Sequence, residues 1–156
     1  MRDSLKWCLG LKDGLRMVKP DGSLAISYMK EAKSSLKRAE RDLNEGDLLW
    51  ATVIIYYAEY YALYSFLQKI GIKCENHFCS ILAVEKLLGK GKTETINRHK
   101  EKRIDAQYYM KTGREEEVKE MLRAAKTFVA EFDAFISWMT NEEIYNYRKK
   151  FASLLR

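Results

Sequence analysis

The spacing of apolar and polar residues along the chain predicts long helices. Between residues 23 and 45, apolar side chains recur every three or four positions, so one face of a helix is apolar while the other is charged. Residues 114–139 repeat this pattern, with glutamates in the first turn that suit the helix dipole. Ser23 is expected to cap the first helix, while Gly46 closes it and Asp47 caps the next one.

The most apolar segment runs from Leu48 to Leu67 and carries one charge, Glu59, near its centre. It is long enough to span a bilayer. However, lipid cannot satisfy an ionised carboxylate and the five tyrosine hydroxyls of this segment. We therefore expect no membrane association, and a helix buried by its amphipathic neighbours. Glu59 then needs an intramolecular partner, a tyrosine hydroxyl network, a subunit interface or a functional site.

Shorter elements are expected between and beyond these helices. Asn76 can cap a helix that Gly89 ends, and a capping-box pattern opens a final helix at Thr140. Residues 90–113 predict a loop followed by an irregular helix, and residues 1–20 predict a loosely helical arm.

Few residues interrupt the helical pattern, since the chain has one proline and eight glycines in 156 residues, a length typical of one domain. We predict an all-α fold: an up-and-down antiparallel four-helix bundle with extra short N- and C-terminal helices. The predicted parts are an N-terminal arm (1–22), the helical bundle (23–139) and a C-terminal helix (140–156). Apolar sectors on both sides of the central helix also predict a homodimer.

Charge and cysteine content narrow the possible setting and partners. The formal net charge of +6 suits an acidic partner such as nucleic acid, and equally a solvated lysine-rich surface. No apolar signal segment precedes the three cysteines, Cys8, Cys74 and Cys79, so we expect buried or idle thiols in a reducing cytoplasm. The sequence contains no paired-cysteine zinc motif and no glycine-rich phosphate loop, so neither a metal nor a cofactor is predicted.

Three stretches carry a resemblance to a known family. The stretch MKEAKSSLKRAERDLNEGDLLWATVIIYYAEYYALYSFLQKIGIKCENH is similar to the start of HEPN domains, which combine an alanine-rich first helix with a tyrosine-rich second one. The stretches KRIDAQYYM and REEEVKEMLRAAKTFV resemble the later part of the same domains. The likeness covers about residues 23–137.

The resemblance implies a dimeric helical bundle that is often encoded beside, or bound to, a small nucleotidyltransferase. Many members of the family cleave RNA as toxins or act against foreign nucleic acid. The first hypothesis is therefore a non-catalytic binding module that acts with a nucleotidyltransferase-type partner, or binds a nucleotide or nucleic acid such as RNA. The alternatives are a metal-independent RNA-cleaving toxin with a degenerate site, and an oligomerising scaffold without a ligand.

The RNA-cleaving branch of the family carries an arginine and a histidine spaced as R-x4-6-H. This sequence departs from that motif, because neither His77 nor His99 follows an arginine at this distance. In the matching region Arg103 is followed by Tyr108, and a tyrosine is a poor base at neutral pH. His77 follows the expected cap Asn76, so a local role at the helix start is predicted, with a ligand or catalytic role as the alternative.

The candidate ligand-binding residues lie in a predicted groove between bundle helices, and are Arg103, Asp105, Tyr108 and Glu59. A structural ion pair with packing is the alternative for the first three. The best phosphate-contact candidates form a basic run interrupted by acidic residues: Lys90, Lys92, Arg98, Lys100 and Lys102. A solvated loop is the alternative for this run.

Overall fold

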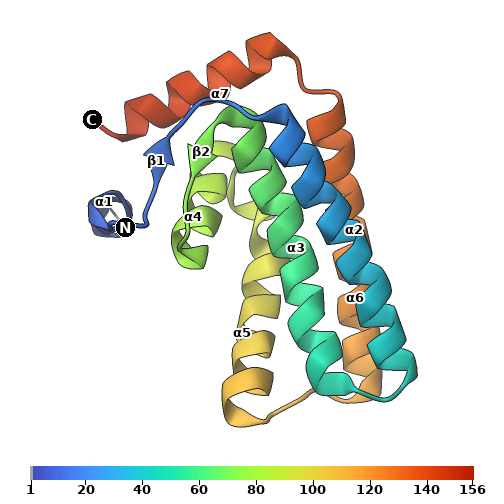
Figure 1. Cartoon of the computed structure of the whole chain (residues 1–156). Coiled ribbons are helices and arrows are strands. Elements are labelled where there is room, and N and C mark those ends of the chain that lie inside the picture. The colour runs from blue at the N-terminus through green and yellow to red at the C-terminus, as the bar shows by residue number, and fades with distance from the viewer. Residues whose placement is uncertain (1) are drawn as a thin grey trace.

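Four long helices run up and down side by side in the part of the chain that the structure describes, which is the backbone of residues 2–156 and the side chains from residue 4 onward. This computed structural model confirms the all-α prediction (Figure 1). The four helices are α2 (Gly22–Asn44), α3 (Leu48–Ile70), α5 (Glu94–Tyr109) and α6 (Glu115–Ser137). Between them lie the short α4 (His77–Leu88) and a 3-10 turn, η1 (Lys90–Lys92).

Helix α3 occupies the centre of the bundle, as its apolar sequence predicts. It packs against α2, α5 and α6, and most of its side chains are buried. A helix enclosed on several sides keeps only a narrow, partly exposed stripe, which in α3 is apolar and aromatic, so its sequence lacks the amphipathic pattern of α2 and α6. No helix in residues 2–156 is long and apolar enough to cross a membrane.

Helix boundaries agree closely with the expected caps. Asp47, Asn76 and Thr140 each accept a hydrogen bond from a backbone N–H of the helix that follows. The exception is α2, where Asp21 rather than Ser23 caps the helix, because its carboxylate accepts the N–H of Leu24 at 2.9 Å.

Helix α5 was expected to be irregular, and this expectation is wrong. Residues 94–109 form a regular helix of 16 residues. Its sequence is strongly polar, and only Ile96, His99 and Ala106 are buried. A narrow buried stripe of this kind gives a weak periodic signal, so packing against α3 stabilises a helix that the pattern alone does not predict.

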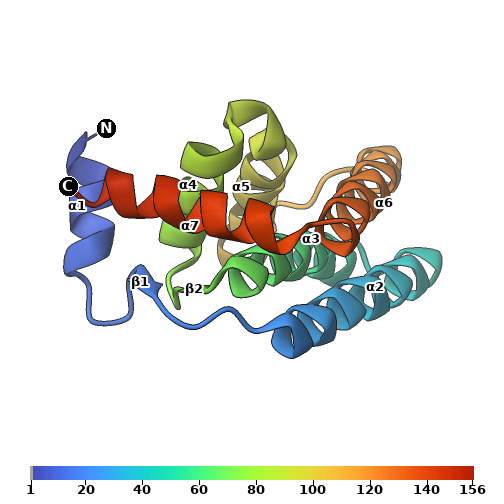
Figure 2. The same cartoon turned by 90° about the horizontal axis from the view of Figure 1, so that it is seen from above.

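The N-terminal arm is more ordered than the sequence indicates. Helix α1 (Arg2–Gly10) is followed by strand β1 (Arg16–Met17), which pairs antiparallel with β2 (Ile72–Lys73) just after α3. Seen from above, α1 lies beyond α4 at one end of the molecule (Figure 2). The short sheet therefore ties the arm to the top of the bundle.

A disulfide bond also ties the arm to the bundle. Cys8 of α1 is bonded to Cys79 of α4, and Cys74 is a free, buried thiol. The expectation of three unpaired thiols is therefore wrong. The two bonded cysteines are 71 residues apart, and nothing in their spacing identifies them as partners.

Helix α7 (Asn141–Leu154) crosses the top of the bundle (Figures 1 and 2). Its Arg148 donates hydrogen bonds from Nη1 to the backbone oxygens of Val18, Ile70 and Gly71, at 2.8, 2.8 and 3.2 Å. One guanidinium thus joins the C-terminal helix, the arm and the end of α3.

Candidate functional site

Arg103 on α5 faces the tyrosine-rich side of α3. Its guanidinium carbon lies 4.7 Å from the ring centroid of Tyr56 and 6.0 Å from that of Tyr57. A guanidinium stacked on an aromatic face can still donate hydrogen bonds to an anion from the N–H groups at its own edge. Nη1 donates to the side chain of Gln107, while Nε is buried without a hydrogen-bond partner in the part of the chain that the structure describes.

His77, at the start of α4, joins the same group of side chains. Its Nδ1 lies 3.0 Å from the hydroxyl of Tyr56, and its ring stacks on Tyr60 at 3.8 Å between centroids. Tyr56 is fully buried, and burial raises the pKa of its hydroxyl, so this group keeps its proton. A buried hydroxyl proton needs an acceptor, and Nδ1 of His77 is the one it has.

This hydrogen bond fixes what the imidazole can do. Burial, together with the cations Arg103 and Lys100, lowers the pKa of His77 to about 4, so the ring is neutral at neutral pH. With Nδ1 accepting from Tyr56, the neutral ring carries its proton on Nε2. His77 is then a hydrogen-bond donor and a poor general base.

Lys100 lies one turn before Arg103 and completes what we call the Arg103 cluster: Tyr56, Tyr57, His77, Lys100 and Arg103. The pKa of Lys100 is lowered by burial and by Arg103. Among residues 4–156, no carboxylate lies within 4.0 Å of either cation. Two cations from one helix thus meet a neutral donor and aromatic rings from two others, without an ion-pair partner.

Glu59 lies beneath this cluster rather than at its surface. The side chain is completely buried, and its Oε1 lies 2.7 Å from Nδ1 of His99 on α5. The intramolecular partner expected for Glu59 is therefore His99. Burial raises the pKa of this carboxyl group, against the opposing effect of His99. Glu59 supports the helix that carries Arg103 and does not face solvent.

The other two predicted ligand residues lie apart from Arg103. On a helix with 3.6 residues per turn, Asp105 and Arg103 are separated by about 160° around the axis. Tyr108 is also well off the Arg103 face and is 67% exposed. The structure therefore brings Arg103 to the tyrosines of α3, and does not group Asp105 and Tyr108 with it.

The predicted basic run separates into several places. Lys100 joins the Arg103 cluster, and Lys102 is exposed. Lys90 and Arg98 line a shallow pocket together with Glu85 and Glu94, so its charge is mixed. These residues do not form one continuous phosphate-binding surface.

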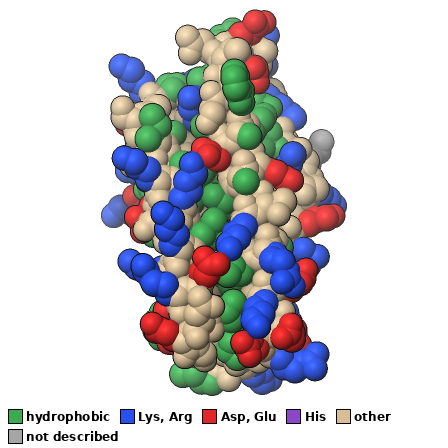
Figure 3. All heavy atoms as spheres, turned by 90° about the vertical axis from the view of Figure 1, so that its right-hand side faces the viewer, with side chains coloured by type: hydrophobic (Ala, Val, Ile, Leu, Met, Phe, Trp, Pro, Cys, Tyr) green, Lys and Arg blue, Asp and Glu red, His purple; other side chains and the backbone are tan. Residues whose placement is uncertain are grey.

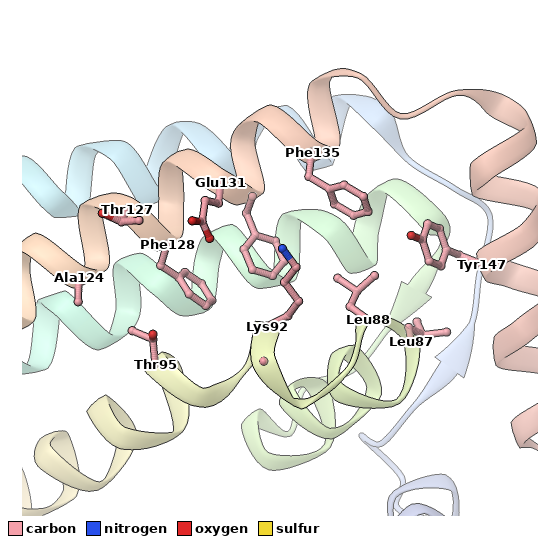
Figure 4. Close-up of a pocket in the computed structure, with 12 residues that line it drawn as sticks. Leu87, Leu88, Lys92, Thr95, Ala124, Thr127, Phe128, Glu131, Phe135 and Tyr147 are labelled. Carbon is pink, nitrogen blue, oxygen red and sulfur yellow. The ribbon is translucent and has the colours of Figure 1, made fainter.

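Lys92 lines a different cavity, of about 790 Å³, between α4, η1, the start of α5, α6 and α7 (Figure 4). Its wall is largely aromatic and aliphatic, with Phe128 and Phe135 from α6 and Tyr147 from α7. Of the predicted site residues, only Lys92 lines this cavity.

Another face of the molecule has the mixed charge of an ordinary solvated surface. Figure 3 shows basic and acidic side chains interspersed on this face. Between α2 and α6, Lys33 lies 2.7 Å from Asp133, and Lys126 lies 3.1 Å from Glu40. Cations paired in this way are less available for phosphate than Lys100 and Arg103.

The sequence analysis did not propose Tyr56 or Tyr57 as site residues, and it gave a ligand or catalytic role for His77 only as the alternative. Tyr56 and Tyr57 belong to a segment interpreted as core, and the segment does bury Tyr56. His77 was assigned a local role beside Asn76. The sequence feature that could have indicated the cluster is the presence of Tyr56, Tyr57 and His77 in largely apolar helices, because a buried hydroxyl or imidazole needs a hydrogen-bond partner.

Comparison with known protein families identifies the helical bundle that carries this cluster. The family profile described as HEPN domain matches residues 26–134, from α2 to α6. The chain belongs to the HEPN family. No curated protein and no solved structure shows a significant match to it. Helices α3, α4 and α5, which supply the Arg103 cluster of this HEPN protein, lie within the matched region, whereas α1 and α7 lie outside it.

Proposed function

We propose that this HEPN protein is a non-catalytic binding module whose Arg103 cluster takes the phosphate of a nucleotide or nucleic acid. One observation carries the proposal: Arg103 stacks 4.7 Å from the ring of Tyr56, whose hydroxyl is hydrogen-bonded to His77, and neither Arg103 nor Lys100 has an ion pair among the described residues. Phosphate matches this set, because a guanidinium, an ammonium and an N–H all donate to its oxygens. The net charge of +6 acts in the same direction.

The absence of a suitable base argues for binding rather than cleavage. An RNA-cleaving site needs a group that accepts a proton near neutral pH. The pKa of His77 is lowered to about 4, and its one lone pair on nitrogen already accepts from Tyr56. Tyr108, which stands near the expected histidine position, is a poor base.

Family membership supports two further parts of the proposal. The resemblance to HEPN domains implies a bundle that is usually dimeric and is often encoded beside, or bound to, a small nucleotidyltransferase, so we propose a homodimer and a partner of this kind. Light scattering should give the mass of a dimer, and the native protein should co-purify with a nucleotidyltransferase. A monomer that co-purifies with no such enzyme would argue against both.

RNA cleavage is retained as a second candidate on one specific observation. His77 and Arg103 lie in one cluster although they are in the reverse order of the family motif in the sequence. If the site cleaves RNA, expression should arrest growth, and both His77→Ala and Arg103→Ala should relieve the arrest. Intact RNA and normal growth with the wild-type chain would reject this candidate.

Binding is tested by fluorescence anisotropy with a labelled single-stranded RNA of eight nucleotides over a series of NaCl concentrations. Affinity should fall steeply with salt, and Arg103→Ala should reduce the slope of log K against log[salt] by about 0.7, the value of one phosphate contact on a single strand. Arg38→Ala is the matched control, because Arg38 is exposed on α2. A flat salt series, or equal losses in the two variants, would reject the proposed site.

A further inference from the structure

Two exposed aromatic side chains lie beside the Arg103 cluster. Trp7 on α1 and Phe78 on α4 are 52% and 44% exposed, and their ring centroids are 6.1 Å apart at an angle of 66°. Large apolar rings are costly to leave in water, and an exposed aromatic pair often marks a contact surface. Trp7 precedes the family match, which covers residues 26–134.

The aromatic pair is continuous with the cations of the cluster. Phe78 directly follows His77, and Nζ of Lys100 lies 5.3 Å from the centroid of the Phe78 ring. Lys100 is close enough to Arg103 for that cation to lower its pKa. Contacts thus join Trp7, Phe78 and Lys100, and Lys100 lies one helical turn before Arg103 on α5.

The disulfide bond holds this pair in place. Trp7 directly precedes Cys8, and Phe78 directly precedes Cys79, which are the two bonded cysteines. The covalent link fixes α1 against α4 at the position where the two rings meet. A surface held rigid before binding loses less conformational entropy when a ligand stacks on it.

We propose that Trp7 and Phe78 form a stacking surface for a base of a single-stranded nucleic acid whose phosphate is held at the Arg103 cluster. This inference rests on the proposed function, since it requires phosphate binding at Arg103 and Lys100. Aromatic rings next to cations are the arrangement by which proteins bind single strands: the rings stack on bases and the cations contact the backbone. Bases paired in a duplex do not expose these faces, so a single strand fits the surface better than a double helix.

Two probes separate base stacking from phosphate binding. One is a fluorescein-labelled oligoadenylate RNA of eight nucleotides, and the other is an abasic oligomer of the same length and charge. The wild-type protein should bind the oligoadenylate roughly fivefold or more tightly than the abasic oligomer, the range that stacking on one aromatic residue supplies. Trp7→Ala should remove this preference and leave the affinity for the abasic oligomer unchanged.

Controls distinguish stacking from general damage to the protein. Trp138→Ala removes another tryptophan that is 85% exposed, at the end of α6, and should bind both probes as the wild type does. Trp7→Phe should retain most of the preference, whereas Trp7→Leu should lose it, because leucine keeps apolar area without an aromatic face. Unchanged affinity of each variant for the abasic oligomer shows that the phosphate site is folded.

The possible failures have different meanings. Equal binding of both probes by the wild type, or a preference that survives in Trp7→Ala, would overturn the stacking surface and leave the phosphate site standing. Failure to bind either probe would overturn the stacking surface together with the proposed function.

Discussion

Glu59 and His99 form a buried pair that joins α3 to α5, with Oε1 of Glu59 2.7 Å from Nδ1 of His99. The second carboxylate oxygen of Glu59 is buried and has no partner among the described residues. Only one of the two oxygens of this carboxyl group therefore has a hydrogen-bond partner, although the whole group is costly to bury. It also fixes α5 one turn before Arg103, so the stability of the fold and the position of the candidate site depend on the same contact.

Removal of His99 should be strongly destabilising. In His99→Ala, the Glu59 carboxyl group keeps its burial and loses its hydrogen-bond partner, which costs about 3–5 kcal/mol for a buried pair. Urea unfolding measures this loss. Asn97→Ala, at an exposed position of the same helix, should change the free energy of unfolding by less than about 0.5 kcal/mol. Similar values for the two variants would show that the pair contributes little.

Glu59→Gln should alter the pH dependence of stability. Burial raises the pKa of Glu59 above its ordinary value of 4.5, so the folded chain binds this proton more tightly than the unfolded chain. The resulting stability is complete below the unfolded pKa, and is lost as the pH rises through the folded pKa. Glutamine cannot titrate, so the free energy of unfolding of Glu59→Gln minus that of the wild type should increase with pH above about 4.5. Urea unfolding at several pH values measures the difference, and a constant difference would contradict the raised pKa.

The sequence predicts the main helices because their signals are local. A cap such as Asn76 and an apolar stripe such as that of α6 depend only on neighbours along the chain. Helix α5 lacks such a stripe, and only its contacts with α3 stabilise it. The disulfide between Cys8 and Cys79 likewise depends on two segments meeting in space.

The candidate site could be predicted only in part for the same reason. Arg103 was identified from its place in the region that resembles the family motif, and Lys100 from the basic composition of its segment. Their grouping with Tyr56 and His77 requires three helices to be placed around one another, which the sequence pattern does not specify. Glu59 was recognised as a group that needs a partner, but the identity of His99 as that partner depends on how α5 packs.

Because Cys8 and Cys79 are bonded to each other, one thiol per chain should react after denaturation without reductant, and three should react after denaturation with reductant. Only Cys74 is free, and it is buried, so the native protein should react slowly. Cys8→Ser should destabilise the protein by about 4 kcal/mol, the loop-closure value for a separation of 71 residues. Thiol titration and urea unfolding measure these two effects. Three reactive thiols in denatured protein that was never reduced would contradict the bond.

Gly71 should tolerate no side chain. It ends α3 with a positive φ of 82°, and a Cβ atom there would meet the backbone oxygen of Val18 and the guanidinium of Arg148. Gly71→Ala should therefore destabilise the protein by at least about 1 kcal/mol. Gly91→Ala is the matched control, because a Cβ atom at that position would meet nothing within 4 Å. Thermal unfolding of both variants measures the effect, and equal melting temperatures would show that the contact is dispensable.

Arg103→Gln should raise the pKa of His77. This pKa is held at about 4 by burial and by the neighbouring cations Arg103 and Lys100, and loss of a nearby charge restores roughly one pH unit. The chain has two histidines, so NMR titration of the ring protons can follow His77 separately from His99. Arg38→Gln removes the same charge from an exposed position on α2 and should leave the pKa of His77 unchanged. If Arg103→Gln also leaves the pKa of His77 unchanged, the charge of the Arg103 guanidinium does not affect the imidazole. Arg103 and His77 could not then bind one phosphate together, because two groups that contact the same phosphate are close enough to interact electrostatically.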